Sequence, residues 1–330
     1  LQAALTEGEH LRRTMSDIIA MYPVVNEGIL NAWEASALIY LGGEENLKMA
    51  RDKLTLTIGG LHDLLRKDPQ DHGMQDIELW RSRAVLAFAH RIRGYLFWVL
   101  GLLQDSAKDY RQAAALWRRV NLKIEMATTL KDMGFVLSEA GESVTGRNLV
   151  KDALALQREL GPRSPVGLSL NTLAKIDIHE GAYESAIVFS EKALVLFRAL
   201  GDQRGIGLAL LALAEAKRRA SGTEKVPAPE NKVELLRAGR DHAQEALEVF
   251  QNIGEKMRQI EALIECGCAC RDWVHVRSVA PSFRDDVERL AQEAAEMLAR
   301  AAEMATDSMI YKKVDALVNL AWLRFYAAQD

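Results

Sequence analysis

The sequence repeats itself every 40 residues, and this period restricts the possible folds more than any other feature. Three rows of residues share it, namely the small residues Gly94, Gly134, Ala174 and Ala214, the glycines Gly101, Gly141 and Gly181, and the alanines Ala113, Ala153 and Ala193. The row of small residues continues at Gly267 and Ala321, after intervals of 53 and 54 residues. Because independent rows keep one spacing, we expect an array of similar structural units.

Each unit is predicted to be a pair of helices. Helical periodicity runs through nearly the whole chain, and no stretch has the alternation expected of a β-strand. Segments such as "KALVLFRALGD" (192–202) and "EALEVFQNIGE" (245–255) contain the glycine that helix C-termini favour. Small residues at one position of the repeat allow two helices to approach closely. We therefore expect an all-α fold in which antiparallel helix pairs stack into a solenoid.

One stretch resembles a known repeat family. The segment "NTLAKIDIHEGAYESAIVFSEKALVL" (171–196) resembles a tetratricopeptide repeat (TPR) in its small, turn and aromatic residues, which are Ala174, Gly181, Tyr183, Ala186 and Ala193. The following segment, "LGDQRGIGLALLALAEA" (200–216), resembles the longer repeats, about 40 residues each, of bacterial signal-transduction ATPase arms and MalT-like regulators. The resemblance extends over about residues 80–328. It implies a right-handed superhelix in which the first helix of each unit lines a concave groove.

The repeat divides the chain into two predicted parts. Residues 1–75 are expected to form an N-terminal helical segment, either a degenerate repeat or a cap, since "WEASALIYLGG" (33–43) matches the repeat weakly. Residues 76–330 are expected to form the TPR-like array. The longer intervals after Ala214 and Gly267 predict insertions near 222–231 and 272–283, because insertions are usually tolerated in loops.

Several function classes lack support in the sequence. No phosphate-binding loop, HExxH, GxSxG or paired CxxC motif occurs, and the seven histidines have no obvious catalytic neighbours. We therefore predict no catalytic residues, metal site or cofactor, and no enzyme activity. No apolar run reaches the roughly 18 to 20 residues of a membrane span. The net charge of −4 disfavours nucleic acid, because nucleic-acid affinity depends on neutralising phosphates.

The predicted function is recognition of a protein or peptide in the groove. Positions at fixed offsets from the small residues lie on one helical face. They predict a partner-binding site of Arg91, Tyr95, Trp98, Lys131, Phe135, Asn171, Lys175, His179, Arg218, Arg219 and Arg271. In the last unit the same offsets fall on Val318, Trp322, Phe325 and Tyr326, which were not counted in that site. Cations and aromatics together suit an acidic peptide. The carboxylate clamp of chaperone-binding TPR proteins does not match, since Phe135 stands where a polar residue would be required.

The larger context has two predicted forms. The chain is expected to be a sensor module within a larger bacterial signalling protein, or alternatively a free-standing scaffold. An RNA-binding helical repeat and an enzyme are the less favoured alternatives. Three cysteines within five residues suit a reducing compartment, so a cytoplasmic location is expected.

The three cysteines, in "ECGCACRDW" (265–273), could suggest a metal site. Gly267 belongs to the row of small residues, so the stretch is predicted to lie within a first helix. Cys266 and Cys270 then share one face, while Cys268 points about 200° away. We therefore expect Cys266 and Cys270 to be packing residues, with Cys268 facing the groove beside Arg271.

Overall fold

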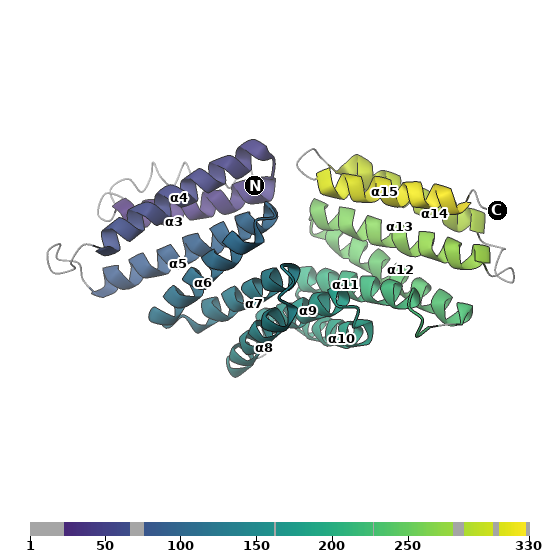
Figure 1. Cartoon of the computed structure of the whole chain (residues 1–330), viewed down its shortest axis with the longest axis horizontal. Helices are drawn as coiled ribbons and strands as arrows, with labels where there is room; N and C mark the ends of the chain where they lie inside the picture. The colour runs from purple at the N-terminus through teal and green to yellow at the C-terminus, as the bar shows by residue number, and fades with distance from the viewer. Residues whose placement is uncertain are drawn as a thin grey trace. The chain divides into compact units, whose positions relative to one another are not determined.

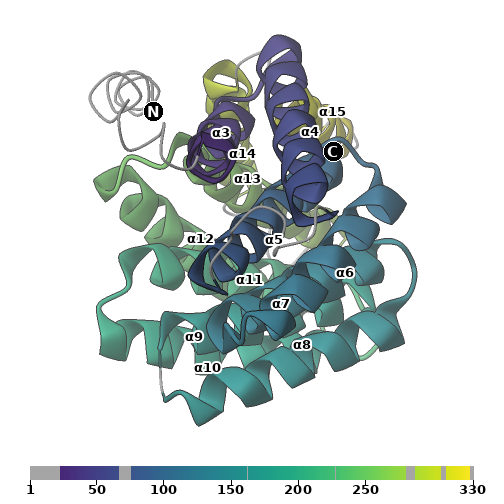
Figure 2. The ribbon, with the colours of Figure 1, turned by 90° about the vertical axis from the view of Figure 1, so that its left-hand side faces the viewer.

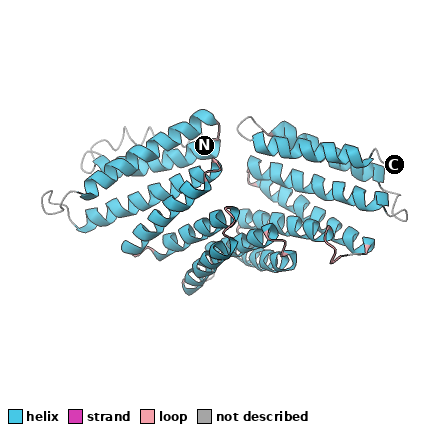
Figure 3. Ribbon diagram, viewed as in Figure 1, coloured by secondary structure: helices cyan, strands magenta, loops and turns pink. Residues whose placement is uncertain are grey.

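The structure is a computed structural model that describes residues 23–66, 76–161, 163–226, 228–279, 287–305 and 310–327. Throughout these residues the regular elements are α-helices, as Figure 3 shows. In chain order they are α3 (Pro23–Leu41), α4 (Glu44–Arg66), α5 (Asp76–Val99), α6 (Leu103–Arg119), α7 (Lys123–Glu139), α8 (Ser143–Glu159), α9 (Ser164–His179), α10 (Tyr183–Leu200), α11 (Gln203–Ser221), α12 (Pro229–Asn252), α13 (Lys256–Val279), α14 (Val287–Met304) and α15 (Ile310–Ala327).

The helices form two compact units, unit 1 from residues 1–159 and unit 2 from residues 160–330. Within unit 1, consecutive helices pair as α3 with α4, α5 with α6 and α7 with α8. Within unit 2, α9 pairs with α10, α11 with α12 and α13 with α14, and α15 packs against both α13 and α14 (Figures 1 and 2). The predicted all-α array of helix pairs is confirmed. We call α3, α5, α7, α9, α11, α13 and α15 the first helices.

Glycines end helices where the repeat predicts them. Gly101, Gly141 and Gly181 have φ angles of 74°, 88° and 76° in the turns between the two helices of a pair. Such positive φ values are easy only for residues without a Cβ atom. Gly201, at the C-cap of α10, has φ 67°, and its backbone N–H donates hydrogen bonds to the carbonyl oxygens of Arg198 and Phe197. The short turns that fold each pair back on itself therefore follow directly from the glycine period.

The row of small residues marks close contacts between helices. An added Cβ on Gly134 of α7 would lie 2.5 Å from the carbonyl oxygen of Gly146 on α8, so the two backbones touch there. Ala174 and Ala214 are fully buried, and a Cβ on Gly267 would meet Leu298 at 2.6 Å. Ala321 differs because it is exposed. Its helix, α15, has no following helix among the described residues.

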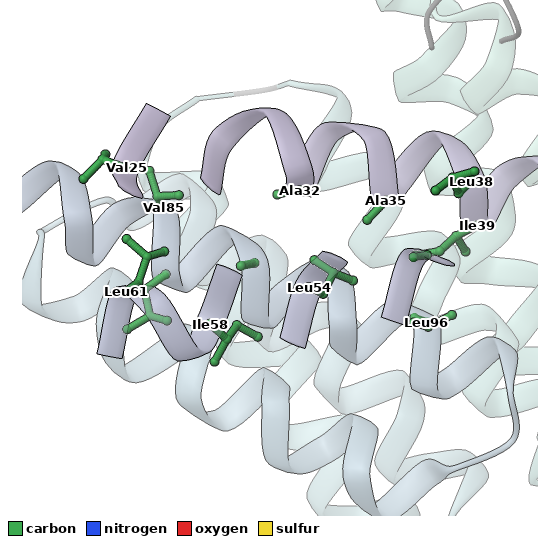
Figure 4. Packing of buried hydrophobic residues seen from close by; sticks show 13 residues of the cluster. Val25, Ala32, Ala35, Leu38, Ile39, Leu54, Ile58, Leu61, Val85 and Leu96 are labelled. Carbon is green, nitrogen blue, oxygen red and sulfur yellow. The ribbon is translucent and has the colours of Figure 1, made fainter. Parts of the chain in front are cut away.

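Helices α3, α4 and α5 of unit 1 share a continuous apolar core. Figure 4 shows Val25, Ala32, Leu38, Leu54 and Leu61, from α3 and α4, packed with residues of α5. Leu54 and Leu61 are fully buried, and each such side chain contributes about 2 kcal/mol relative to exposure. Within the predicted N-terminal segment 1–75, residues 1–22 and 67–75 lie outside the described part. The part that is described forms a helix pair that packs on α5.

The predicted insertions differ in form. The first is a short connection between Ser221, where α11 ends, and Pro229, where α12 begins. The second was expected at 272–283, but residues 272–279 continue α13, and residues 280–286 lie outside the described part. Trp273 and Val274 are buried in the core of unit 2, which favours extending the helix over opening a loop. Part of the extra length is thus taken up by 24-residue helices, α12 and α13.

Candidate functional site

The candidate site consists of the faces that the first helices present in each unit, which we call the first-helix face. In unit 1, side-chain contacts join α5 to α7: Arg91 reaches Asp132, and Trp98 reaches Phe135 and Glu139. In unit 2, Arg218 on α11 reaches α13, and Arg271 on α13 reaches α15. In each unit, side-chain contacts therefore connect neighbouring first helices.

An aromatic cluster occupies the first-helix face of unit 1. Tyr95 stacks on Trp98 with ring centroids 5.6 Å apart, and Trp98 meets Phe135 edge to face at 6.0 Å. The Trp98 indole N–H donates to the Glu139 carboxylate. Trp98 and Phe135 are half-buried, whereas Tyr95 is 41% exposed. Tyr95, Trp98 and Phe135, which the repeat offsets predicted, thus come together around an accessible ring.

The predicted cations of unit 1 converge on one carboxylate. Asp132 on α7 accepts hydrogen bonds from Arg91 and from Lys131, and Arg91 lies 3.8 Å from Glu125 as well. Burial alone would raise the pKa of Asp132, but the charges of Lys131 and Arg91 outweigh it and lower this pKa. The half-buried cations Arg91 and Lys131 therefore already have a carboxylate partner inside the chain.

The three predicted arginines of unit 2 are also paired internally. Arg218 donates to Glu265 at 2.5 Å and lies 3.2 Å from Asp272. Arg219 pairs with Glu215 one helical turn earlier at 2.8 Å. Arg271 binds Asp272 and also donates to Asn319 on α15. These arginines were predicted to bind a partner, but their charges are already balanced by carboxylates of the chain itself.

The remaining predicted residues of unit 2 lie on α9. Asn171 is buried, at 5% exposure, and its Oδ1 atom has no hydrogen-bond partner. Lys175 is half-buried one turn later, and no carboxylate among the described residues lies within 4.0 Å of its Nζ atom. His179 is exposed at the C-terminal end of the helix. Lys175 thus differs from the paired cations around it.

Several residues of this face lie outside the repeat offsets used to predict it. Arg258, Glu261 and Glu265 on α13 belong to it, because they contact residues of the neighbouring first helices or of their own face. Positions 258, 261, 265, 268 and 272 follow one another at intervals of three and four, which places them on one side of a helix. That spacing was visible in the sequence. The repeat offsets do not include Arg258, Glu261 and Glu265, because those offsets select only certain positions close to the small residue Gly267.

Exposed aromatic residues also mark the last helix. Trp322 and Phe325 on α15 are 48% and 53% exposed, and their rings meet edge to face at 5.8 Å. Val318 on the same helix is 49% exposed. These are the residues that the offset rule placed on the groove side of the last unit. Each unit therefore has accessible apolar or aromatic side chains on its first-helix face.

The cysteines are packing residues. Cys266 packs with Ala214 and Ala243, and Cys270 packs with Trp273 and Leu290, as expected. Cys268 lies on the same side of α13 as Glu265 and Asp272, but at 4% exposure it is buried rather than accessible in a groove. Burial raises the pKa of the Cys268 thiol to about 12, against the opposing charge of Arg218. Because a neutral thiol prefers the apolar interior, all three behave as small core residues.

A separate buried ion-pair cluster links α5 to α6 in unit 1. The Asp109 carboxylate accepts hydrogen bonds from Arg93 at 2.6 and 2.9 Å and faces the His90 ring nitrogen Nδ1 at 2.8 Å. The His62 ring of α4 meets the His90 ring edge to face at 5.7 Å. Burial alone would raise the pKa of Asp109, but the hydrogen bonds from Arg93 and His90 outweigh it and lower this pKa. The cluster is therefore a structural clasp between helices.

No group of three or more His, Cys, Asp or Glu side chains is arranged to hold a metal ion in that part of the chain. Among the same residues, no helix combines the length and the apolar character needed to cross a lipid bilayer.

Comparison with known proteins identifies the fold. No family model and no curated protein matches the sequence. Among solved structures, BtubC (BKLC) from P. vanneervenii is 12% identical, with a TM-score of 0.54 over 77% of this chain and 92% of its own. A Rap protein complexed with competence and sporulation factor is also 12% identical, with a TM-score of 0.48 over 95% of this chain and 98% of that one.

A signal-transduction ATPase with a tetratricopeptide repeat sensor, from Pyrococcus horikoshii, is 13% identical. Its TM-score is 0.37, over 92% of this chain and 54% of that one. Identities this low bear on the fold alone. The chain is a TPR-like array of helical hairpins.

Proposed function

We propose that this chain recognises a protein or peptide partner on its first-helix faces. The observation that carries the proposal is the pair of aromatic patches there, with Tyr95 in unit 1 and Trp322 and Phe325 in unit 2 left 41–53% exposed. Large exposed aromatic side chains beside charged groups are typical of protein-interaction surfaces. Burying them under a partner would remove apolar area from water while the ion pairs beside them orient the ligand.

RNA binding and catalysis are less well supported. Phosphate recognition requires cations free to replace counterions, and Arg91, Lys131, Arg218 and Arg271 each have a carboxylate of this chain beside them. Catalysis requires a set of acid, base or nucleophilic groups around an accessible reacting position. The buried cysteines and the clasp at Asp109 do not provide one. Binding is therefore the function that the arrangement of side chains favours.

The proposed context is a sensor module within a larger bacterial signalling protein. The alternative is a free-standing scaffold. A phosphate-binding-loop domain encoded upstream in the same gene would favour the sensor, and its absence would favour the scaffold. We propose a cytoplasmic location, since the three cysteines are free thiols rather than disulfides.

The aromatic patches provide the test of binding. The full chain is cross-linked to its partners in host cells, the main partner is identified, and its affinity for variants is measured by titration. We expect Tyr95→Ala and the double variant Trp322→Ala/Phe325→Ala each to weaken binding at least about tenfold, as truncation of interface anchors usually does. Helicity measured by circular dichroism should be unchanged.

A matched control is Val195→Ala, which truncates an apolar side chain that is 70% exposed on α10, away from the first helices. It should leave the affinity within a factor of two. If both aromatic variants also bind the partner like the wild type, these patches are not the binding surface and the proposal fails.

A further inference from the structure

A cluster of charged side chains from four first helices lies on the first-helix face of unit 2. Its members are Lys175 on α9, Glu215 on α11, Arg258 and Glu261 on α13, and Lys312 on α15. Each of the other four groups acts electrostatically on Lys175. The cluster therefore joins helices that are far apart in the sequence, and two of its cations, Arg258 and Lys312, were not among the predicted site residues.

Both carboxylates of the cluster are already occupied. The Glu261 Oε2 atom lies 2.5 Å from Arg258, and its Oε1 atom lies 3.2 Å from the Nζ atom of Lys312. Burial alone would raise the pKa of Glu261, but Arg258, Lys312 and Lys175 outweigh it and lower this pKa to about 2. Glu215 pairs with Arg219 at 2.8 Å. Neither carboxylate therefore has its closest contact with Lys175.

Within this cluster, Lys175 is the cation that has no carboxylate of the described residues at contact distance. No carboxylate of the described residues lies within 4.0 Å of its ammonium group, although the side chain is half-buried. The pKa of Lys175 is lowered, because burial and the charge of Arg258 outweigh the opposite effect of Glu261 and Glu215. A half-buried ammonium group has lost part of its hydration, so an anion brought to it gains more than at an exposed lysine.

We propose that Lys175, with Lys312 beside it across Glu261, binds an acidic side chain of the peptide or protein partner. This inference rests on the proposed function, and it narrows the partner to one that places an Asp or Glu on the first-helix face of unit 2. The carboxylate would complete the hydrogen bonding of the Lys175 ammonium group, which donates three hydrogen bonds and accepts none.

The surrounding charges favour a single carboxylate over a polyanion. Glu215, Glu261, Glu265 and Asp272 all lie on the same face, so a nucleic-acid backbone or a row of phosphates would meet fixed negative charges. A single carboxylate can reach Lys175 between these negative charges without lying against all of them. The exposed Trp322 and Phe325 on α15, the helix that also carries Lys312, supply apolar contacts for the flanking residues of the same ligand.

The test uses peptides selected from a random display library on the full 330-residue chain. The best binder is synthesised with its acidic residue unchanged, replaced by the matching amide, or replaced by phosphoserine, and with a free or amidated C-terminus. We expect the amide to weaken binding to the wild type at least about tenfold, and amidation of the C-terminus to have little effect. Tighter binding of the phosphoserine peptide than of the acidic one would reassign the ligand to phosphate and overturn the carboxylate proposal.

Lys175→Met keeps the length of the side chain and removes its charge. We expect this variant to bind the acidic peptide and its amide equally weakly, while Lys175→Arg restores the preference for the acidic peptide. The control Lys192→Met removes an exposed lysine from α10 and should bind like the wild type. A Lys175→Met variant that keeps the wild-type preference for the acidic peptide would overturn the inference.

A second measurement separates this inference from the proposed function. Glutarate is titrated into the chain after its lysines have been methylated with ¹³C, and the Lys175 signal is assigned with Lys175→Arg. We expect a saturable shift of the Lys175 signal that the Lys192 signal lacks. If glutarate shifts the Lys175 signal but the display library yields no binding peptide, the anion site is supported and the proposed peptide recognition is contradicted. Selected peptides that bind without this shift would support recognition and contradict the anion site.

Discussion

At the scale of single residues, the sequence identifies charged positions but not their partners. Arg218 was predicted from its offset to Ala214, and the structure places it on the predicted face. Its guanidinium is nevertheless held by Glu265 and Asp272, which lie 47 and 54 residues away in the chain. An ion pair between side chains so distant in sequence depends on helix register across the array, which no local pattern specifies.

The buried Asp109 offers a test at this scale. Its pKa is lowered in the folded state, so its contribution to stability is fully present above the ordinary carboxyl pKa and is lost as the pH falls through the lowered value. We expect Asp109→Asn to reduce the free energy of unfolding by about 3 kcal/mol at neutral pH, since it leaves Arg93 without its counter-charge. Urea unfolding measures this difference.

The difference between wild type and Asp109→Asn should shrink in acid, once the wild-type carboxyl is protonated as well. Asp152→Asn, a change at an exposed position of α8, should alter the free energy of unfolding by no more than about 0.5 kcal/mol. A cost for Asp109→Asn that stays the same at acidic pH would mean that the carboxylate charge does not stabilise the clasp.

At the scale of helices, the array depends on how closely paired helices approach. Gly134 and Gly146 bring the backbones of α7 and α8 into contact. The 40-residue row predicted the small residue at 134, but it did not identify Gly146 as its partner. Residue size decides whether two helices can touch, whereas the rotation of one helix about its axis decides which residues meet.

Two glycine-to-alanine substitutions test this packing in opposite directions. A Cβ on Gly134 would lie 2.5 Å from a backbone oxygen, which cannot move away easily, so Gly134→Ala should lower the free energy of unfolding by about 1–3 kcal/mol. Gly59 is an exposed residue within α4 with nothing within 4 Å of its added Cβ. Gly59→Ala should raise the free energy of unfolding by about 0.5–1 kcal/mol through helix propensity alone.

Chemical denaturation of the two variants gives both values. Each change adds one methyl group within a helix. The difference between their effects on the free energy of unfolding therefore reports the contact between α7 and α8. Stabilisation of the chain by Gly134→Ala would contradict the close approach of α7 and α8.

At the scale of the whole chain, stability is expected to be distributed along the sequence. The helices with extensive contacts are adjacent or next but one in chain order. In such arrays, each repeat is stabilised by contacts within it and with its nearest neighbours. The destabilisation caused by a local change therefore extends only a short distance along the chain.

Hydrogen exchange tests this distribution. Gly134→Ala should reduce amide protection in α7 and α8 and leave it unchanged in α12 and α13. Gly207→Ala, whose Cβ would meet the Phe250 ring at 2.5 Å, should reduce protection in α11 and α12 and leave α3 and α4 unchanged. A uniform loss of protection along the chain in either variant would show that the array unfolds as one cooperative block.

The sequence by itself determined the helical hairpin repeat. The 3.6-residue periodicity, the glycines that end helices and the row of small residues are local signals, so the fold class, the turns and the aromatic cluster of Tyr95, Trp98 and Phe135 could all be predicted. The continuation of α13 through residues 272–279 could not, since it depends on burial of Trp273 and Val274 against other helices.

Only the tertiary structure decided which charges on the first-helix faces remain available. Arg218, Arg219 and Arg271 look equivalent to Lys175 in the sequence, and all four lie on the predicted face. The stacking of α9, α11, α13 and α15 gives each arginine a carboxylate and leaves Lys175 without one among the described residues. The physical reason is that charge pairing depends on distances of a few ångströms between separate helices, which the repeat period does not contain.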